Sequence, residues 1–344
     1  MDLILRNARI APDPDRLTDI GIAGGRIAAI EPRLAAEGET IDLGGRLISA
    51  GFVETHIHLD KSCILDRVKS EKGDLEEAIA EAAKAKAAFT PEDVHARATQ
   101  TLEKAILQGT THMRTHLEVD PGVGLRSLEG VLPLIKDYAW AIDLQICVFP
   151  QEGLLNNPGT DELMVEALDR GCRAVGGAPY VDSNPAGQID RVFELAREYD
   201  IDVDLHLDFG PTADGMDLEH VCKRTEEYQY GGRVAIGHVT KAVSLSMPAF
   251  EAAAKRLADA GVALTVLPST DLYLMGRHHT HDHNVTRGVV PADYGLAVGK
   301  SADLVVLDST SPEMAVAELT PVLYAFKRGR KTVSRQPANL HRPQ

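Results

Sequence analysis

Between residues 52 and 267, short apolar stretches alternate with longer amphipathic ones, and this alternation limits the fold more than any other feature of the chain. Strands that alternate with helices form parallel sheets, because each helix carries the chain back to the start of the next strand. Seven strands in series predict the α/β class and a distorted (β/α)8 TIM barrel. The predicted strands are 52–57, 111–116, 143–149, 174–178, 203–207, 234–237 and 262–267, and the predicted helices are 75–88, 91–108, 161–169, 189–199, 218–228 and 247–260.

The two ends of the chain have a different pattern. The first fifty residues alternate apolar and polar side chains around Gly-Gly turns, as β-hairpins do. Residues 299–308 are typical of a turn followed by a buried strand, and 322–333 of another hairpin. Hairpins need a second layer to bury their apolar face, so the two ends are predicted to form one small β-sandwich. The predicted domains are a β-sandwich of residues 1–49 plus 293–344 and a barrel of residues 50–292.

The seventh predicted strand is followed by too little chain to complete the barrel. One β/α unit takes about 30 residues, whereas only residues 268–293 precede the C-terminal part of the sandwich, and many of them are polar. Either the barrel is incomplete, or a segment with the eighth strand is missing from the sequence near Ala292 and Asp293. We favour a missing segment, because an open barrel leaves strand edges unpaired.

Charge and cysteine content narrow the classes of partner. The chain has 36 Lys and Arg against 51 Asp and Glu, and this net charge of −15 repels nucleic-acid backbones. No apolar run reaches the roughly 18 residues of a membrane span, and the N-terminus lacks a signal-peptide pattern. The four cysteines are scattered without a CxxC pair, which is typical of a reducing compartment. We therefore expect a cytoplasmic protein without nucleic-acid or membrane partners.

His56 and His58 end the first predicted barrel strand. Residues two apart share one face of a strand, and barrel active sites lie at the C-terminal ends of the strands. The two imidazoles thus point the same way, and neutral imidazoles are natural ligands of zinc or iron. His206 ends the fifth predicted strand and is the expected third ligand. The competing interpretations are a chance H-x-H pair in a loop and a hydrogen-bonded core histidine.

His238 ends the sixth predicted strand and can serve as a metal ligand or as a hydrogen-bond donor to a substrate, with a core histidine as the alternative. His116 can also line the pocket. A catalytic metal keeps an open position for water, whose pKa it lowers towards neutrality. A carboxylate normally completes such a site and moves protons, and its usual source is the eighth strand that the sequence lacks.

Successive predicted strand ends carry a resemblance to a known family through the segments GFVETHIHLDKS, THMRTHLEVD, VFPQEG, HLDFG and GHVTKA. In order and spacing they resemble the amidohydrolase superfamily, specifically its cytosine deaminase branch, which includes the N-isopropylammelide amidohydrolases. The resemblance extends over nearly the whole chain. It implies a distorted (β/α)8 barrel, a small β-sandwich and one divalent metal ion, zinc or iron.

The resemblance also implies roles for individual residues. Gln151 matches the glutamine that reads the ring amide of the substrate, and Phe149 lies where the branch packs a wall against the ring. His238 matches the histidine that stabilises hydroxide and substrate. Three histidines match the metal ligands: His56, His58 and His206.

Two departures from the branch bear on the chemistry. The fifth-strand motif of the branch is His-x-x-Glu, whose glutamate shuttles the proton, whereas this chain has Phe209 at that place. Phenylalanine cannot carry a proton. We therefore expect Phe209 to contact the substrate rather than to act in proton transfer. Asp208 lies two residues from His206, is expected on the same strand face, and joins His238 as a predicted catalytic residue. The eighth-strand aspartate of the branch has no counterpart in the sequence.

These features predict a metal-dependent amidohydrolase or deaminase, in which metal-activated water hydrolyses a non-peptide C–N bond of a small nitrogen heterocycle. The alternative substrates are an N-alkylamino-triazine and a cyclic amide, which the missing glutamate favours. An alternative of another class is a degenerate barrel that binds a ligand without turnover, supported by Phe209 and the absent aspartate. By resemblance we also expect a homo-oligomer.

Two other features are given simpler interpretations. Four histidines crowd the segment 278–283, and we interpret it as a polar loop near the barrel mouth rather than a metal site or a lid. Lys61 is not expected to be the carboxylated lysine of a two-metal site, because in related barrels that lysine comes from the fourth strand, which has none here. One metal ion is therefore expected.

Overall fold

The barrel strands follow one another in chain order. The computed structural model describes residues 1–11, 13–69, 71–275, 296–317 and 319–335. Within these ranges, seven parallel strands form one sheet in which neighbours in sequence are also neighbours in space. They are β6 (Phe52–Ile57), β7 (Thr110–Glu118), β8 (Asp143–Phe149), β9 (Ala174–Val175), β10 (Asp202–Leu207), β11 (Val234–His238) and β12 (Val262–Thr265).

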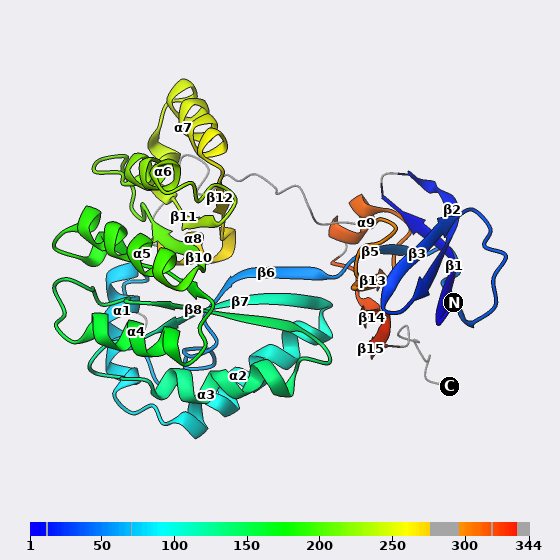
Figure 1. Ribbon diagram of the computed structural model, residues 1–344, viewed down its shortest axis with the longest axis horizontal. Helices are drawn as coiled ribbons and strands as arrows, with labels where there is room; N and C mark the ends of the chain where they lie inside the picture. The colour runs from blue at the N-terminus through cyan, green and yellow to red at the C-terminus, as the bar shows by residue number, and fades with distance from the viewer. Residues whose placement is uncertain (12, 70, 276–295, 318, 336–344) are drawn as a thin grey trace.

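Helices connect these strands, as the sequence pattern predicts (Figure 1). They are α1 (Leu75–Lys86), α2 (Pro91–Leu107), α3 (Arg126–Asp137), α4 (Thr160–Asp169), α5 (Pro185–Tyr199), α6 (Leu218–Glu227), α7 (Met247–Ala260) and α8 (Pro268–Leu274). The sequence did not predict α3, which contains Gly130 and Pro133, nor the short α8. Glycine and proline lower helix propensity, and packing overrides that preference in α3. None of the helices in the described ranges is long and apolar enough to cross a membrane.

Helix α2 illustrates how local sequence determines the element ends. The Thr90 hydroxyl accepts a hydrogen bond from the Asp93 N–H at 3.2 Å, and Pro91 occupies the first helical position, where no N–H is needed. Arg97 of the same helix donates from Nη1 to the carbonyl oxygen of Asp60 at 2.9 Å. This contact ties the helix to the loop that follows β6.

The first and last barrel strands meet at a seam. Within the described residues β6 pairs only with β7, and β12 pairs only with β11. The two strands approach each other where the Thr265 hydroxyl lies 3.4 Å from the Thr55 hydroxyl. The part of the chain described here therefore forms a nearly closed barrel of seven strands. The peptide between Ala292 and Asp293 lies outside the described residues, so the missing segment stays a prediction.

A cavity of about 1140 Å³ opens inside this barrel. Side chains normally fill the interior of an eight-stranded barrel in layers. Here the cavity is lined by residues of β6 to β8 and β10 to β12 and by α7, and Asp204 is one of its polar groups. The cavity therefore extends from the barrel strands to the helix α7 that packs outside them.

Both ends of the chain join in a second sheet, drawn in blue and in orange to red at one end of the molecule (Figure 1). Its eight strands form one mixed sheet, joined throughout by hydrogen bonds, with an apolar core of its own. The two ends of the chain thus come together, as the predicted sandwich requires. The strands are β1 (Leu3–Ile10), β2 (Asp13–Ala23), β3 (Arg26–Glu31), β4 (Glu39–Asp42), β5 (Leu47–Ala50), β13 (Leu304–Leu307), β14 (Val322–Lys327) and β15 (Arg330–Ser334), with α9 (Pro312–Ala317) beside them.

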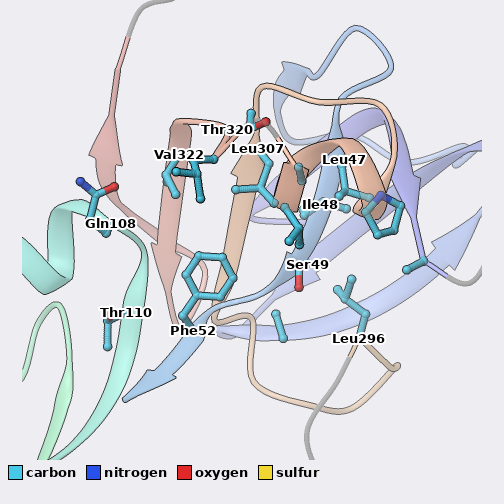
Figure 2. Close-up of a pocket in the computed structure, with 16 residues that line it drawn as sticks. Leu47, Ile48, Ser49, Phe52, Gln108, Thr110, Leu296, Leu307, Thr320 and Val322 are labelled. Atoms are coloured by element: carbon cyan, nitrogen blue, oxygen red, sulfur yellow. The ribbon is translucent and has the colours of Figure 1, made fainter. Parts of the chain in front are cut away.

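A buried lysine joins this sheet to the barrel. Lys327 Nζ of β14 donates to the Thr111 carbonyl oxygen at 2.9 Å, to Asp143 at 2.9 Å and to Asp303 at 2.8 Å. Figure 2 shows a mostly apolar pocket of about 690 Å³ at the same junction, bordered by Phe52 and other side chains of the sheet and the barrel. No histidine lines this pocket, so it is separate from the chemistry described next.

Candidate metal centre

His56 and His58 leave β6 at an irregular stretch of strand pairing. The register of β6 with β7 shifts between Glu54 and Ile57, and Glu54 Oε1 accepts a hydrogen bond from the His56 N–H at 2.9 Å. Such irregularities re-aim side chains and are frequent beside active sites. The His56 ring packs directly on Gly237 of β11. A Cβ atom there would lie 2.8 Å from His56 Cε1, so only glycine leaves room for the ring.

The three predicted ligand histidines lie together. The ring centre of His206 is 4.4 Å from that of His56 and 5.2 Å from that of His58. The Nε2 atoms of His58 and His206 are 3.2 Å apart. The ring centres of His56 and His58 are separated by 5.7 Å. Side chains from β6 and β10, about 150 residues apart in sequence, thus face one shared space.

Two more histidines complete the cluster. His116 of β7 is fully buried, and its ring centre lies 4.2 Å from that of His56. The ring centre of His238 lies 5.1 Å from that of His56. His238 and Val239 have φ angles of 69° and 50°, a left-handed conformation that a β-branched residue rarely adopts. Backbone strain of this kind clusters at functional sites.

A buried carboxylate holds His238. Asp271 of α8 is fully buried, and its Oδ1 lies 2.6 Å from His238 Nδ1. Asp271 Oδ2 in turn accepts a hydrogen bond from the Leu267 N–H at 3.3 Å. A ring nitrogen of His238 also lies within 4.8 Å of ligand nitrogens of both His56 and His206. The pair thus fixes an imidazole at the edge of the cluster.

The donor set of the cluster suits a divalent metal ion. Among the described residues, both ring nitrogens of His56 and Nδ1 of His58 and His206 are buried without a hydrogen-bond partner. Burial holds the pKa values of these three rings well below the usual range, and neighbouring imidazoles lower them further, as Lys61 also does for His56 and His58. They are therefore neutral, with lone pairs free for coordination. Buried polar groups nearly always have partners, and a bound ion would supply one here.

Aromatic rings border the cluster. The Phe149 ring stacks on the His206 ring with centres 4.5 Å apart, and the Phe209 ring meets the His238 ring edge-on at 5.2 Å. Gln151 is buried, and its Nε2 has no hydrogen-bond partner in the described part of the chain. Apolar walls with one unpaired amide are suited to a flat ligand that has a polar edge.

The structure corrects the expectation for Asp208. Strand β10 ends at Leu207, and Asp208 has a φ of 50°, so strand alternation does not extend to it. Its carboxylate instead accepts hydrogen bonds from the N–H groups of Asp217 at 2.7 Å and Leu218 at 3.2 Å. Burial raises the pKa of Asp208 to about 6. The prediction that Asp208 shares the face of His206 is therefore wrong, and its carboxylate is engaged at the start of α6.

An ionic network adjoins the histidine cluster. Lys86 Nζ is buried at the end of α1, 2.7 Å from Glu118 and 2.8 Å from Asp120, and it also contacts Glu152. Lys61 forms a second ion pair with Glu118. Although burial opposes ionisation, the two ammonium groups hold the pKa of Glu118 at about 2. This network fixes the ends of β7 and β8 beside the cluster.

The sequence reasoning missed Asp271 and Asp204 and gave His116 too little weight. His116 lies near the end of a predicted strand, and the T-H-M-R-T-H pattern was the available signal for it. Asp271 belongs to a helix that no periodic pattern announced. The predicted polar loop at 278–283 lies outside the described residues.

Comparisons with known proteins agree with this geometry. Residues 39–133 match the model of the amidohydrolase family. The chain is 29% identical to N-isopropylammelide isopropyl amidohydrolase of Pseudomonas sp. (strain ADP), with 96% of each chain covered. The 5-methylcytosine deaminase of Klebsiella pneumoniae, liganded with 5-fluorocytosine, superposes with a TM-score of 0.90 at 25% identity over 99% of each chain. The N-isopropylammelide isopropylaminohydrolase of Burkholderia multivorans superposes with a TM-score of 0.77 at 24% identity, covering 96% of this chain and 98% of that one.

By fold and by sequence together, the chain resembles the amidohydrolase superfamily, specifically its cytosine deaminase-like branch. The predicted resemblance and the predicted fold class are thereby confirmed. The alignment with the Pseudomonas protein runs over 392 positions, more than the 344 residues of this chain, so that relative has residues without a counterpart here.

Proposed function

We propose that the chain is a metal-dependent hydrolase that releases ammonia or an amine from a ring carbon of a nitrogen heterocycle. The observation that carries the proposal is the convergence of His56, His58 and His206. Both ring nitrogens of His56 and the Nδ1 atoms of the other two rings are buried without a hydrogen-bond partner in the described residues. Neutral imidazoles without partners are costly in a protein interior unless something coordinates them.

These three histidines would hold one divalent ion, zinc or iron. When bound, such an ion supplies a Lewis acid that lowers the pKa of water towards neutrality. His238 is fixed by Asp271 and would donate a hydrogen bond to the negative charge that develops on the substrate.

The substrate would be a flat heterocycle. Phe149 and Phe209 offer apolar ring surfaces on two sides of the cluster, and the rings exclude water from the reacting carbon. The buried amide of Gln151 can donate and accept hydrogen bonds at once, as a ring amide also does. Gln151 would therefore orient the ring by its polar edge.

Phe209 favours a second candidate substrate, an N-alkylamino-triazine. Its apolar ring faces His238, at the place where a glutamate would provide a charge. An alkyl group on the leaving nitrogen would find an apolar contact there. The amidohydrolase activity in the name of the Pseudomonas relative supports this candidate.

A screen of metal-loaded protein tests the proposal. Metal-free protein would be loaded with zinc, iron or manganese and incubated with cytosine, 5-methylcytosine, N-isopropylammelide and cyclic ureas, and ammonia and alkylamine would be measured. We expect release from at least one substrate, lost after chelation and in His206→Ala. The matched control is His95→Ala, because His95 contacts the Gly130 carbonyl oxygen on the outer helices. Metal-loaded protein without any release would contradict the proposal and favour a ligand-binding barrel without turnover.

Further proposals concern the whole protein. We propose a cytoplasmic homo-oligomer that takes no nucleic-acid or membrane partner. All four cysteines are free, which suits a reducing compartment, and the net charge of −15 disfavours nucleic acid. The proposed domains remain residues 1–49 plus 293–344 and residues 50–292. An apolar core built only from the two ends of the chain supports this division, whereas the barrel core also includes Leu47 and Val305 of the sheet.

A further inference from the structure

His116 faces all three histidines of the proposed metal centre. Its ring centre lies 4.2 Å from that of His56, 4.7 Å from that of His206 and 5.7 Å from that of His58. The side chain is fully buried. Both of its ring nitrogens lack a hydrogen-bond partner in the described part of the chain. The ring is thus as poorly satisfied as the three proposed ligands, and in the same place.

Two successive contacts, from Arg114 to Asp204 and from Asp204 to His116, position the His116 ring. His116 Nε2 lies 3.3 Å from Asp204 Oδ1, close but outside hydrogen-bond alignment. Asp204 Oδ2 accepts a hydrogen bond from Arg114 Nη1 at 2.8 Å. Metal-bound histidines commonly turn one ring nitrogen to a carboxylate, which leaves the other for the metal.

His56, His116 and Asp204 form one of the compact groups that could hold an ion, and His58 and His206 are not part of that group. One ligand atom each of His56, His116 and Asp204 lies within 4.8 Å of the others. The described residues contain no carboxylate from an eighth barrel strand that would complete the set of donors around the three histidines.

We propose that His116 is a fourth nitrogen donor of the metal centre, positioned by Asp204. The assignment rests on the proposed metal-dependent function and adds a ligand from the second barrel strand. Asp204 acts through the imidazole and is a positioning residue. In a four-donor set of this kind one ring nitrogen of His116 would bind the ion, and the other would keep its contact with Asp204.

Cobalt binding tests the assignment without any measurement of turnover. Metal-free protein would be titrated with Co²⁺, and the visible absorption bands would report both affinity and coordination. Competition with Zn²⁺ would provide the zinc dissociation constant. We expect His116→Ala to weaken binding by about 10- to 100-fold and to change the visible bands, and Asp204→Asn to weaken binding less.

A matched control is available on the surface of α6. His220 Nε2 pairs with Asp190 at 2.7 Å, outside the cluster, so His220→Ala removes a histidine beside an aspartate without touching the proposed site. Its Co²⁺ affinity and spectrum should equal those of the unchanged protein. Far-UV circular dichroism of each metal-free variant checks folding, and His116→Gln keeps a polar side chain of similar length if the alanine variant does not fold.

X-ray absorption of the unchanged zinc-loaded protein supplies a readout that needs no variant. Four imidazole ligands support the assignment, whereas three overturn it. Unchanged affinity and bands in a folded His116→Ala or His116→Gln protein overturn it as well and leave the proposed function intact. An unchanged chain that binds neither Co²⁺ nor Zn²⁺ overturns the proposed function and the fourth donor together.

Discussion

Asp271 Oδ1 lies 2.6 Å from His238 Nδ1, and this carboxylate is fully buried. The pairing joins the helix after β12 to the end of β11, where His238 and Val239 adopt a strained backbone. An imidazole held in this way has a fixed orientation. Helix α8, the last described element of the barrel, therefore holds a histidine of the cluster in place. No eighth strand follows this helix in the described residues.

Asp271→Asn should lower kcat by about 10- to 100-fold, the usual effect of removing a partner that orients a site histidine. Metal affinity should change by less than about twofold, because Asp271 contacts His238 and not the three proposed ligands. Steady-state kinetics and a zinc titration measure the two effects. The control is Asp190→Asn, which breaks the histidine–aspartate pair between α5 and α6 and should leave both quantities unchanged. Equal kcat values for Asp271→Asn and the unchanged protein would contradict the role assigned to this pair.

Phe209→Glu should create cytosine deaminase activity or raise it at least about tenfold, because a positioned carboxylate adds general acid–base catalysis worth about 10²- to 10⁴-fold. The Phe209 ring lies 5.2 Å from the His238 ring, so a glutamate there reaches the same space. Ammonia release from cytosine is the measurement. Phe209→Gln has nearly the same shape as glutamate but transfers no proton, and it should show no gain. A gain of equal size in both variants would mean that space rather than proton transfer is limiting.

Lys86→Met should destabilise the fold by about 3 to 5 kcal/mol, because it leaves buried carboxylates without their counter-charge. Lys86 is 3% exposed and contacts Glu118, Asp120 and Glu152. Lys84→Met is the control on the same helix: Lys84 is 73% exposed, and its loss should change stability by less than about 0.5 kcal/mol. Urea unfolding of the two variants measures the difference. Similar midpoints for both would show that the buried network adds nothing to stability.

Zinc should raise the unfolding temperature of metal-free protein, because ligands that bind only the folded state stabilise it. At a free concentration of 100 times the dissociation constant, the gain is about 2.7 kcal/mol. The gain should vanish in His56→Ala and persist in His95→Ala. Differential scanning calorimetry provides the measurement. The same zinc-induced shift in His56→Ala would place the bound ion outside the cluster.

The sequence pattern predicted the strands and most helices well, because strong periodicity and caps such as Thr90 are local signals. It also brought His56, His58 and His206 together, because residues at the ends of parallel strands meet at one end of a barrel. The strand was predicted to end at Leu207, as it does, but its alternation was carried one residue further, to Asp208. The positive φ of this residue ends the alternation of side chains along the strand, and no local sequence pattern predicts such a turn at an aspartate.

Other site features depend on contacts between distant segments. The Asp271–His238 pair spans 33 residues, and Lys86 meets Glu118 across 32. Hydrophobic periodicity does not predict such pairs, because each partner looks like an ordinary polar residue in the sequence. The seam between Thr55 and Thr265 and the cavity beside it likewise appear only when all the strands are placed.

Anomalous diffraction at the zinc edge from crystals of the zinc-loaded protein tests the central claim most directly. The account predicts one strong peak at the end of β6 and β10, about 2.0 to 2.3 Å from a ring nitrogen of each of His56, His58 and His206. A peak elsewhere, two peaks of equal height in the cluster, or no peak at all in fully zinc-loaded crystals would contradict it.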